Sequence, residues 1–143
     1  LKKDLDRLSR AYNDAAGHTA DFNLNLLHRM RAELGAELNP DGFEHRAFFN
    51  QDQSRIEMHL AAKGAQSIRL GAHEFVFADG ETIHTENSCK YDIKGFQALA
   101  ARAGFEAVQS WTDADDLFSI HFLESASPAG GARNYGPSRF VPG

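Results

Sequence analysis

Cysteine is almost absent from this sequence, since Cys89 is the only one among 143 residues. An internal disulfide is therefore excluded, and we expect a reducing compartment, by default the cytoplasm. Long apolar stretches are also lacking, so the sequence predicts no helix that could cross a bilayer and no membrane partner. No signal-peptide pattern is present.

Clusters of basic residues are the next absence. The chain has 15 Lys and Arg against 20 Asp and Glu, which gives a net charge of -5. We expect no nucleic-acid partner, because such binding requires a basic patch or stripe. Hydrophobic residues make up 42% of the chain, including eleven Phe, and this predicts one domain, or a small domain with a piece of another. The chain begins with Leu1 rather than Met, and we expect it to be part of a longer polypeptide.

Two helices open the predicted fold. A charged segment with Leu5 and Leu8 as its apolar contacts predicts a helix over residues 1–16. A second helix is predicted to begin at Thr19 as its cap and to end at Gly35. Its apolar residues recur at every fourth position and predict a single buried stripe, formed by Phe22, Leu26, Met30 and Leu34.

Alternating patterns predict antiparallel strands in the middle of the chain. In the segment 54–62, Ile56, Met58 and Leu60 share one face, whereas Arg55, Glu57 and His59 share the other. Further strands are expected at residues 46–50, 67–70, 74–77 and 82–88. The expected fold class is therefore α+β, with helices and an antiparallel meander.

The pattern changes after residue 90. Asp92 is expected to cap a helix that ends at Gly104, and strands are expected at 105–111 and 117–123. Residues 124–143 contain three of the four prolines, so we expect a poorly ordered tail there.

The segment Thr85–Ser88 carries the first candidate binding residues. Side chains two apart on a strand share a face, so Glu86 and Ser88 are expected to point the same way. A carboxylate beside a hydroxyl suits a ligand with N–H groups, such as an imidazole or an amine. The spacing alone favours the alternative, a half-exposed strand end with polar residues. Met58 is similarly favoured as a core residue, with the wall of a ligand pocket as the other interpretation.

Seven histidines raise the question of a metal site. Glu57 with His59, and His84 with Glu86, are predicted to be same-face pairs on strands. The sequence has no closed ligand set such as HExxH, so we expect no metal site. It also has no glycine-rich strand-to-helix turn, so we expect no cofactor-binding residue in this chain.

Four segments together resemble the histidine-specific, S-adenosylmethionine-dependent methyltransferases, whose best-known member trimethylates the α-amine of L-histidine in ergothioneine biosynthesis. They are AYNDAAGHTADFN at residues 11–23, RIEM at 55–58, GETIHTENSCKY at 80–91 and WTD at 111–113. They follow the order of the family at about its spacing. The resemblance covers residues 1–123.

The resemblance implies a division of the chain. Residues 1–90 correspond to a substrate-recognition region, and residues 91–123 to the closing helix and two strands of a Rossmann-like class I methyltransferase sheet. S-adenosylmethionine is then expected to bind in an N-terminal part that this chain lacks, which leaves the chain inactive alone. We also expect self-association through the sheet edge that such a division exposes.

The resemblance also assigns residues to the site. Tyr12 matches the tyrosine that contacts the amino and carboxylate end of the amino-acid substrate, and it is the expected catalytic residue. Thr19 matches the pocket threonine, and Met58 the methionine beside the imidazole. Glu86 and Ser88 match the pair that holds the imidazole. His18 and Asn87 stand where relatives often have aliphatic residues, which leaves the choice of substrate open.

Two other functions remain open from the sequence. The chain could be a non-catalytic module that binds an amino acid with the same pocket residues. It could also be a small metal-binding β domain that uses His59, His84 and Glu86.

Overall fold

The computed structural model describes residues 1–126, and its chain divides into two compact units. One unit spans Lys2–Lys90, and the other contains the residues from Tyr91 onward together with Leu1. Residues 127–143, on which most of the expected tail falls, lie outside the described part. None of the helices in residues 1–126 is long and apolar enough to cross a membrane.

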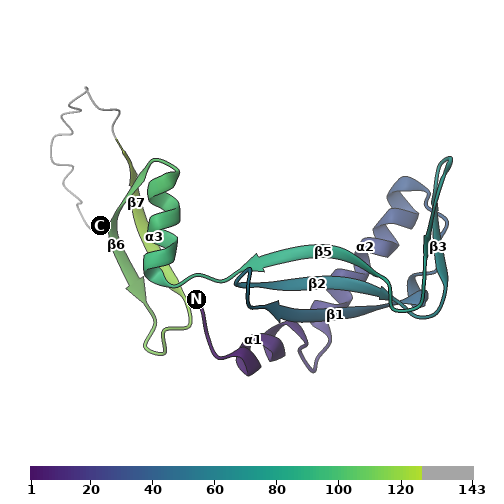
Figure 1. Ribbon diagram of the computed structural model, residues 1–143, viewed down its shortest axis with the longest axis horizontal. Helices are drawn as coiled ribbons and strands as arrows, with labels where there is room; N and C mark the ends of the chain where they lie inside the picture. The colour runs from purple at the N-terminus through teal and green to yellow at the C-terminus, as the bar shows by residue number, and fades with distance from the viewer. Residues whose placement is uncertain (127–143) are drawn as a thin grey trace, which may run out of the picture. The chain divides into compact units, whose positions relative to one another are not determined.

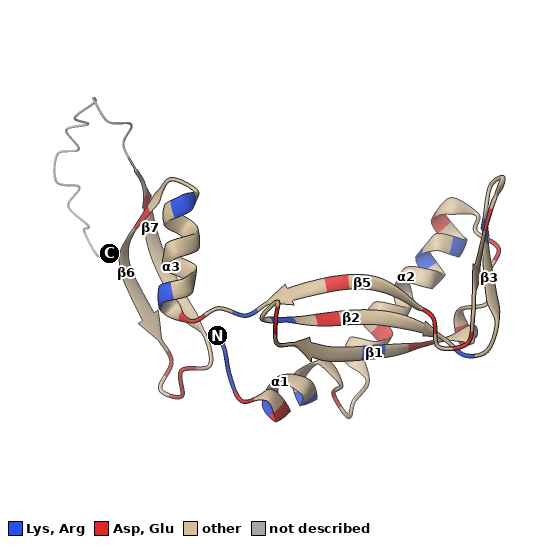
Figure 2. Cartoon of the chain, in the orientation of Figure 1, with Lys and Arg blue, Asp and Glu red and all other residues tan. Residues whose placement is uncertain are grey.

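The Lys2–Lys90 unit begins with two helices, α1 (Leu5–Tyr12) and α2 (His18–Leu34) (Figure 1). The Asp4 side chain caps α1 by accepting a hydrogen bond from the Arg7 N–H, so this helix is shorter than expected. Gly35 ends α2 in the left-handed conformation with φ of 64°, as expected. Basic and acidic residues are interspersed along both helices (Figure 2).

The start of α2 differs from the expectation that Thr19 caps it. The Asp14 carboxylate accepts hydrogen bonds from the backbone N–H groups of His18 and Thr19, both at 2.9 Å. Gly17, with φ of 78°, allows the turn that brings Asp14 back to the helix end. These N–H bonds and a side-chain bond from Thr19 lower the pKa of Asp14 to about 2.

Five strands follow, arranged as a three-stranded sheet and a separate hairpin. The sheet has the order β1 (Phe43–Asn50), β2 (Arg55–Ala62) and β5 (Thr82–Cys89), and all its pairs are antiparallel. A short 3-10 helix, η1 (Pro40–Gly42), precedes β1. The hairpin consists of β3 (Gln66–Leu70) and β4 (His73–Phe77), and it is inserted between β2 and β5. The strands are antiparallel as expected, but β5 pairs with β2 rather than with β4, so they do not form one continuous meander.

The core of this unit lies between the sheet and the two helices. Ile56, Met58 and Leu60 are buried on one face of β2, which confirms the alternation expected for this strand. Ile56 and Met58 pack with Leu8 of α1, and Leu60 packs with Leu27 of α2. Both helices therefore cover the same face of the sheet.

The expected apolar stripe on α2 is wrong for most of its members. Phe22 is 67% exposed and Leu34 60% exposed, whereas Asn23 and Leu27 are buried. The amide of Asn23 is satisfied inside: Nδ2 donates to the His59 carbonyl at 3.0 Å, and Oδ1 accepts from the Thr85 hydroxyl at 2.7 Å. A polar residue can therefore lie on the buried face of a helix when its hydrogen bonds are satisfied, and a search for apolar residues alone does not find such a face.

The second unit consists of α3 (Ile93–Arg102), β6 (Phe105–Thr112) and β7 (Ser119–Ser125). Asp92 caps α3 by accepting from the Gly95 N–H at 2.7 Å, as expected. β6 and β7 form an antiparallel pair, and β7 runs two residues past the strand end expected at residue 123. The mixture of helices and antiparallel strands in both units confirms the α+β class.

Candidate functional site

The candidate site lies on the helix-covered face of the β1–β2–β5 sheet. In the antiparallel register, Glu86 stands opposite Met58, and Ser88 stands opposite Ile56. Directly opposed residues place their side chains on the same face, so Glu86 and Ser88 both point to the side where Met58 and Ile56 meet the helices. The shared face expected from their spacing is therefore present.

A β-bulge at Thr85 adjusts the position of these residues. Met58 pairs with Glu86 and His59 with His84, so Thr85 is the extra residue between the two pairs. Its hydroxyl bonds to Asn23 of α2 at 2.7 Å, which ties β5 to the helix beside the candidate site. The expectation that His84 and Glu86 share a face is wrong, because the bulge shifts the alternation by one residue.

Three polar side chains meet at the end of β5 closest to α1. The hydroxyls of Tyr12 and Ser88 share a hydrogen bond of 2.7 Å. The Lys90 ammonium donates to Tyr12 Oη at 2.6 Å and to Ser88 Oγ at 2.7 Å, and it lies 4.6 Å from the centre of the Tyr12 ring. Tyr12 and Ser88, which are 76 residues apart in the chain, are thus brought into direct contact.

The neighbours of the Tyr12 hydroxyl shift its pKa in both directions. Burial by itself would raise the pKa of the Tyr12 hydroxyl, but hydrogen bonds with Lys90 and Ser88 and the positive charge of Lys90 outweigh burial. The pKa of Tyr12 is therefore lowered, even though the Glu86 carboxylate acts in the opposite direction. This opposing effect also indicates that Glu86 lies within electrostatic range of the Tyr12 hydroxyl.

A pocket of about 170 Å³ lies beside this group, between α2 and β5. Glu86 and Thr85 line it from the strand, and Phe22 and Leu26 line it from the helix. Asn23, Asn25 and Arg29 complete the lining. The exposed face of α2 therefore forms an apolar wall opposite a carboxylate, a combination that suits a flat ring with N–H groups.

The remaining two expected site residues lie close to this pocket in different ways. Met58 is 2% exposed and packs with Leu8 and Ile56, so it belongs to the core, beside Glu86 on the neighbouring strand. Thr19 lies in the first turn of α2, where its backbone N–H bonds to Asp14. It precedes Asn23 by four residues and Leu26 by seven, which puts it on the same side of the helix as the pocket wall.

Sequence reasoning missed three contributors to this site. Lys90 was not singled out, although it follows Ser88 by two residues, directly after the end of β5, and is a cation beside a tyrosine. Phe22 and Leu26 were assigned to the core and instead line the pocket. Leu27 is the signal that could have found them. It is an apolar residue of α2 outside the expected stripe, and it supplies the buried contact of the helix in place of Phe22 and Leu26.

The fold and the pocket define a candidate binding region, and comparison with known proteins gives the family of the chain. The model of the histidine-specific, SAM-dependent methyltransferases matches residues 1–125, so the chain belongs to this family. The resemblance carried by the four sequence segments is thereby confirmed.

Three curated relatives show how much of the family this chain represents. It is 48% identical over 122 residues to the histidine N-alpha-methyltransferase of Mycolicibacterium smegmatis, and 44% identical over 122 residues to that of Mycobacterium tuberculosis. In both, the match covers 84% of this chain and 38% of the relative. The N-methyltransferase fsqC of Aspergillus fumigatus is 28% identical over 121 residues, covering 81% of this chain and 31% of the relative. The chain thus spans about two fifths or less of the length of these relatives.

Proposed function

We propose that residues 1–90 form the substrate-holding region of an S-adenosylmethionine-dependent N-methyltransferase that acts on the α-amine of L-histidine or a similar amino acid. The observation that carries the proposal is the position of Glu86, which faces the apolar wall of Phe22 and Leu26 across the pocket. Family membership supplies the reaction class, and the relatives named histidine N-alpha-methyltransferase supply the substrate.

The described residues do not fit a site for S-adenosylmethionine. Such a cofactor commonly lies at a glycine-rich turn between a parallel strand and a helix. The strand pairs within residues 1–126 are all antiparallel, and no such turn occurs among them. We therefore propose no contact between residues 1–126 and the methyl donor, and the roles below concern the amino acid alone.

In this proposal, the imidazole of the substrate lies against Phe22 and Leu26 and donates a ring N–H to Glu86. A charge-assisted bond of this kind contributes about 1.5–3 kcal/mol when the site is screened from water. Ser88 lies on the same strand face two residues further along and offers a second hydroxyl contact.

Tyr12 is proposed to orient the amine. Its hydroxyl is held by Ser88 and Lys90, so its direction is fixed before a substrate arrives. The Lys90 ammonium donates to Tyr12 Oη, so this oxygen acts as an acceptor, and an N–H of the substrate amine can use its remaining lone pair. Holding the amine in one orientation contributes to catalysis through proximity.

The compartment and the pathway are proposed from the family resemblance. On that basis, the protein is a cytoplasmic enzyme of ergothioneine biosynthesis.

Titration of L-histidine into the full-length protein that contains this chain tests the proposal, with S-adenosylhomocysteine present. Glu86→Ala is expected to weaken binding by roughly 10–100-fold, because the imidazole N–H loses a charged acceptor. Asn87→Ala is the matched control, since Asn87 is the next residue on β5, pairs with Glu57 and faces the other side of the sheet. Equal binding by Glu86→Ala and the parent protein would contradict the assignment. A methyl-transfer assay on the same protein separates an enzyme from a module that only binds the amino acid.

A further inference from the structure

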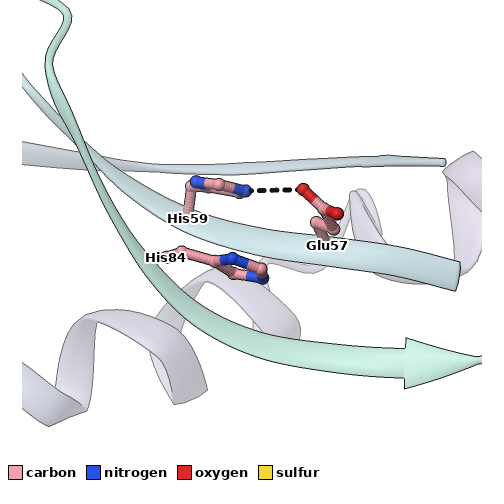
Figure 3. A group of neighbouring side chains, drawn as sticks. All are labelled: Glu57, His59 and His84. Carbon is pink, nitrogen blue, oxygen red and sulfur yellow. Dashed lines mark hydrogen bonds and ion pairs between the residues drawn. The ribbon is translucent and has the colours of Figure 1, made fainter. Parts of the chain in front are cut away.

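The other face of the β1–β2–β5 sheet carries a second group of functional side chains. Glu57 and His59 of β2 and His84 of β5 each offer one ligand atom, and these atoms all lie within 4.8 Å of one another (Figure 3). His59 and His84 are directly opposed across the two strands. Glu86, which the sequence suggested as the third member of such a group, points to the opposite face, and Glu57 takes its place.

Each of the three side chains is held at one atom by a neighbour. Glu57 Oε1 accepts hydrogen bonds from Arg55 at 2.8 Å and from Asn50 at 2.9 Å. His59 Nδ1 lies 3.1 Å from the Thr82 hydroxyl, and His84 Nε2 lies 3.2 Å from the Glu86 carbonyl oxygen. The second polar atom of each side chain is then Glu57 Oε2, His59 Nε2 and His84 Nδ1. Outer partners of this kind orient metal ligands in many proteins.

Ring stacking holds the His59 ring from both sides. The His59 ring lies between Phe48, with centres 5.1 Å apart, and His84, with centres 4.4 Å apart and planes 12° from parallel. The Glu57 side chain is 9% exposed and that of His59 is 12% exposed, so two members of the group are largely shielded from water. His84 is exposed, which leaves an entry route for an ion.

We propose that Glu57, His59 and His84 bind one divalent transition-metal ion of the zinc type. Two imidazoles and one carboxylate form a known ligand set for zinc, with a fourth position left to water. Two of the three ligand atoms are imidazole nitrogens, and this disfavours magnesium and calcium, which need several oxygen ligands. The ion replaces the contact of 3.3 Å between His59 Nε2 and Glu57 Oε2.

Binding requires the ligand atoms to draw closer together than they are in the metal-free arrangement. Zinc lies about 2.0–2.2 Å from nitrogen and carboxylate oxygen, so ligand atoms must approach to within about 3.5 Å of one another. Rotation of the exposed His84 ring away from the Glu86 carbonyl supplies this movement, because Glu57 and His59 are the more buried members of the group. The proposal does not depend on the methyl-transfer function, because the pocket lies on the other face of the sheet.

The test is a zinc titration of the full-length protein that contains this chain, at pH 7.5 in the presence of a chromophoric chelator as competitor. Zn²⁺ alone is the probe. We expect one ion per chain for the parent protein and at least a tenfold loss of affinity in His84→Ala and in Glu57→Gln. His73→Ala is the matched control, because His73 is an exposed histidine on a strand of the same unit, outside the ligand group, and it should bind as the parent does.

Both possible outcomes of this titration are decisive. Because His84 is exposed, its replacement leaves the fold intact, and circular dichroism of the variant checks this. Loss of the stoichiometric ion in His84→Ala but not in His73→Ala supports the site. The proposal is overturned by an absence of stoichiometric zinc in the parent, or by equal affinity in His84→Ala and His73→Ala. L-histidine binding measured on the same samples shows separately whether the pocket on the other face is intact.

Discussion

The two units of this chain differ in how well they bury their apolar side chains. In Lys2–Lys90, Leu27, Ile56 and Leu60 are fully buried between a three-stranded sheet and two helices. In the described part of the other unit, Ala100 is the only buried hydrophobic residue. Six large apolar side chains of that unit are at least 42% exposed: Phe105, Val108, Trp111, Phe118, Ile120 and Phe122.

The difference follows from the number of layers that each unit contains. Two helices and three strands can enclose a core, because each element has a partner for its apolar face. A helix and a two-stranded hairpin leave one face of the hairpin uncovered, and isolated hairpins are marginally stable in water. We infer that the Lys2–Lys90 unit supplies most of the folding free energy of the described residues.

The largest expected effect comes from a core truncation compared with a surface truncation. Leu60→Ala removes a fully buried side chain and should lower the free energy of unfolding by about 2–5 kcal/mol. Ile120→Ala, at a position that is 58% exposed, should change it by no more than about 0.5 kcal/mol. Chemical denaturation of the 143-residue chain measures both. Similar losses for the two variants would refute the proposed difference between the units.

A smaller effect is expected from the buried polar residue of the first unit. Asn23→Ala leaves the Thr85 hydroxyl and the His59 carbonyl without their partner on α2, at a cost of about 1–3 kcal/mol. Asn25→Ala, two positions further along α2 and exposed, is the control and should be nearly neutral. If both variants unfold at the same denaturant concentration, the link between α2 and the bulge contributes nothing to stability.

The smallest effect is the contribution of aspartate caps, which depends on pH. The pKa of Asp14 is lowered from 3.8 to about 2 by the N–H groups of Thr19 and His18. A carboxyl group with a lowered folded-state pKa stabilises the fold above its unfolded pKa, and this contribution disappears as the pH falls through the folded value. Asp14→Ala should therefore melt at a lower temperature than the parent at pH 7, and the difference should shrink between pH 4 and pH 2.

Asp113 offers the matching variant in the second unit. Its carboxylate accepts from the backbone N–H groups of Leu117 at 2.6 Å and of Phe118 at 2.9 Å, which lowers its pKa. Asp113→Ala should have a smaller effect on the melting temperature than Asp14→Ala, because the turn that it holds carries little buried surface. A larger effect would mean that the β6–β7 unit controls the stability of the chain.

The sequence predicted the kind and order of most elements, because these depend on local rules. The alternation in β2, the Asp92 cap and the stop at Gly35 are each determined by side chains within a few residues. The shared face of Glu86 and Ser88 was also predictable, because no irregularity lies between them. Their roles in binding were predicted from the family resemblance and remain to be tested.

The features that could not be predicted depend on contacts between distant segments. The buried face of α2 contains Asn23 only because Thr85 and His59, far along the chain, supply its hydrogen bonds. Lys90 becomes part of the site through Tyr12, 78 residues away. The three possible metal ligands come together because β5 pairs with β2 across an inserted hairpin, which no local pattern in the sequence indicates.

The bulge at Thr85 lets one short strand serve both faces of the sheet. His84 and Glu86 are both even-numbered positions, and in a regular strand their side chains would lie together on one face. The extra residue reverses the phase, so that His84 joins His59 on one face while Glu86 joins Met58 on the other. Deleting Thr85 would restore regular pairing and would force one of these two residues onto the wrong face. The extra residue between positions 84 and 86 therefore determines which face of the sheet each side chain occupies, and it matters as much for both proposed sites as the identity of either side chain.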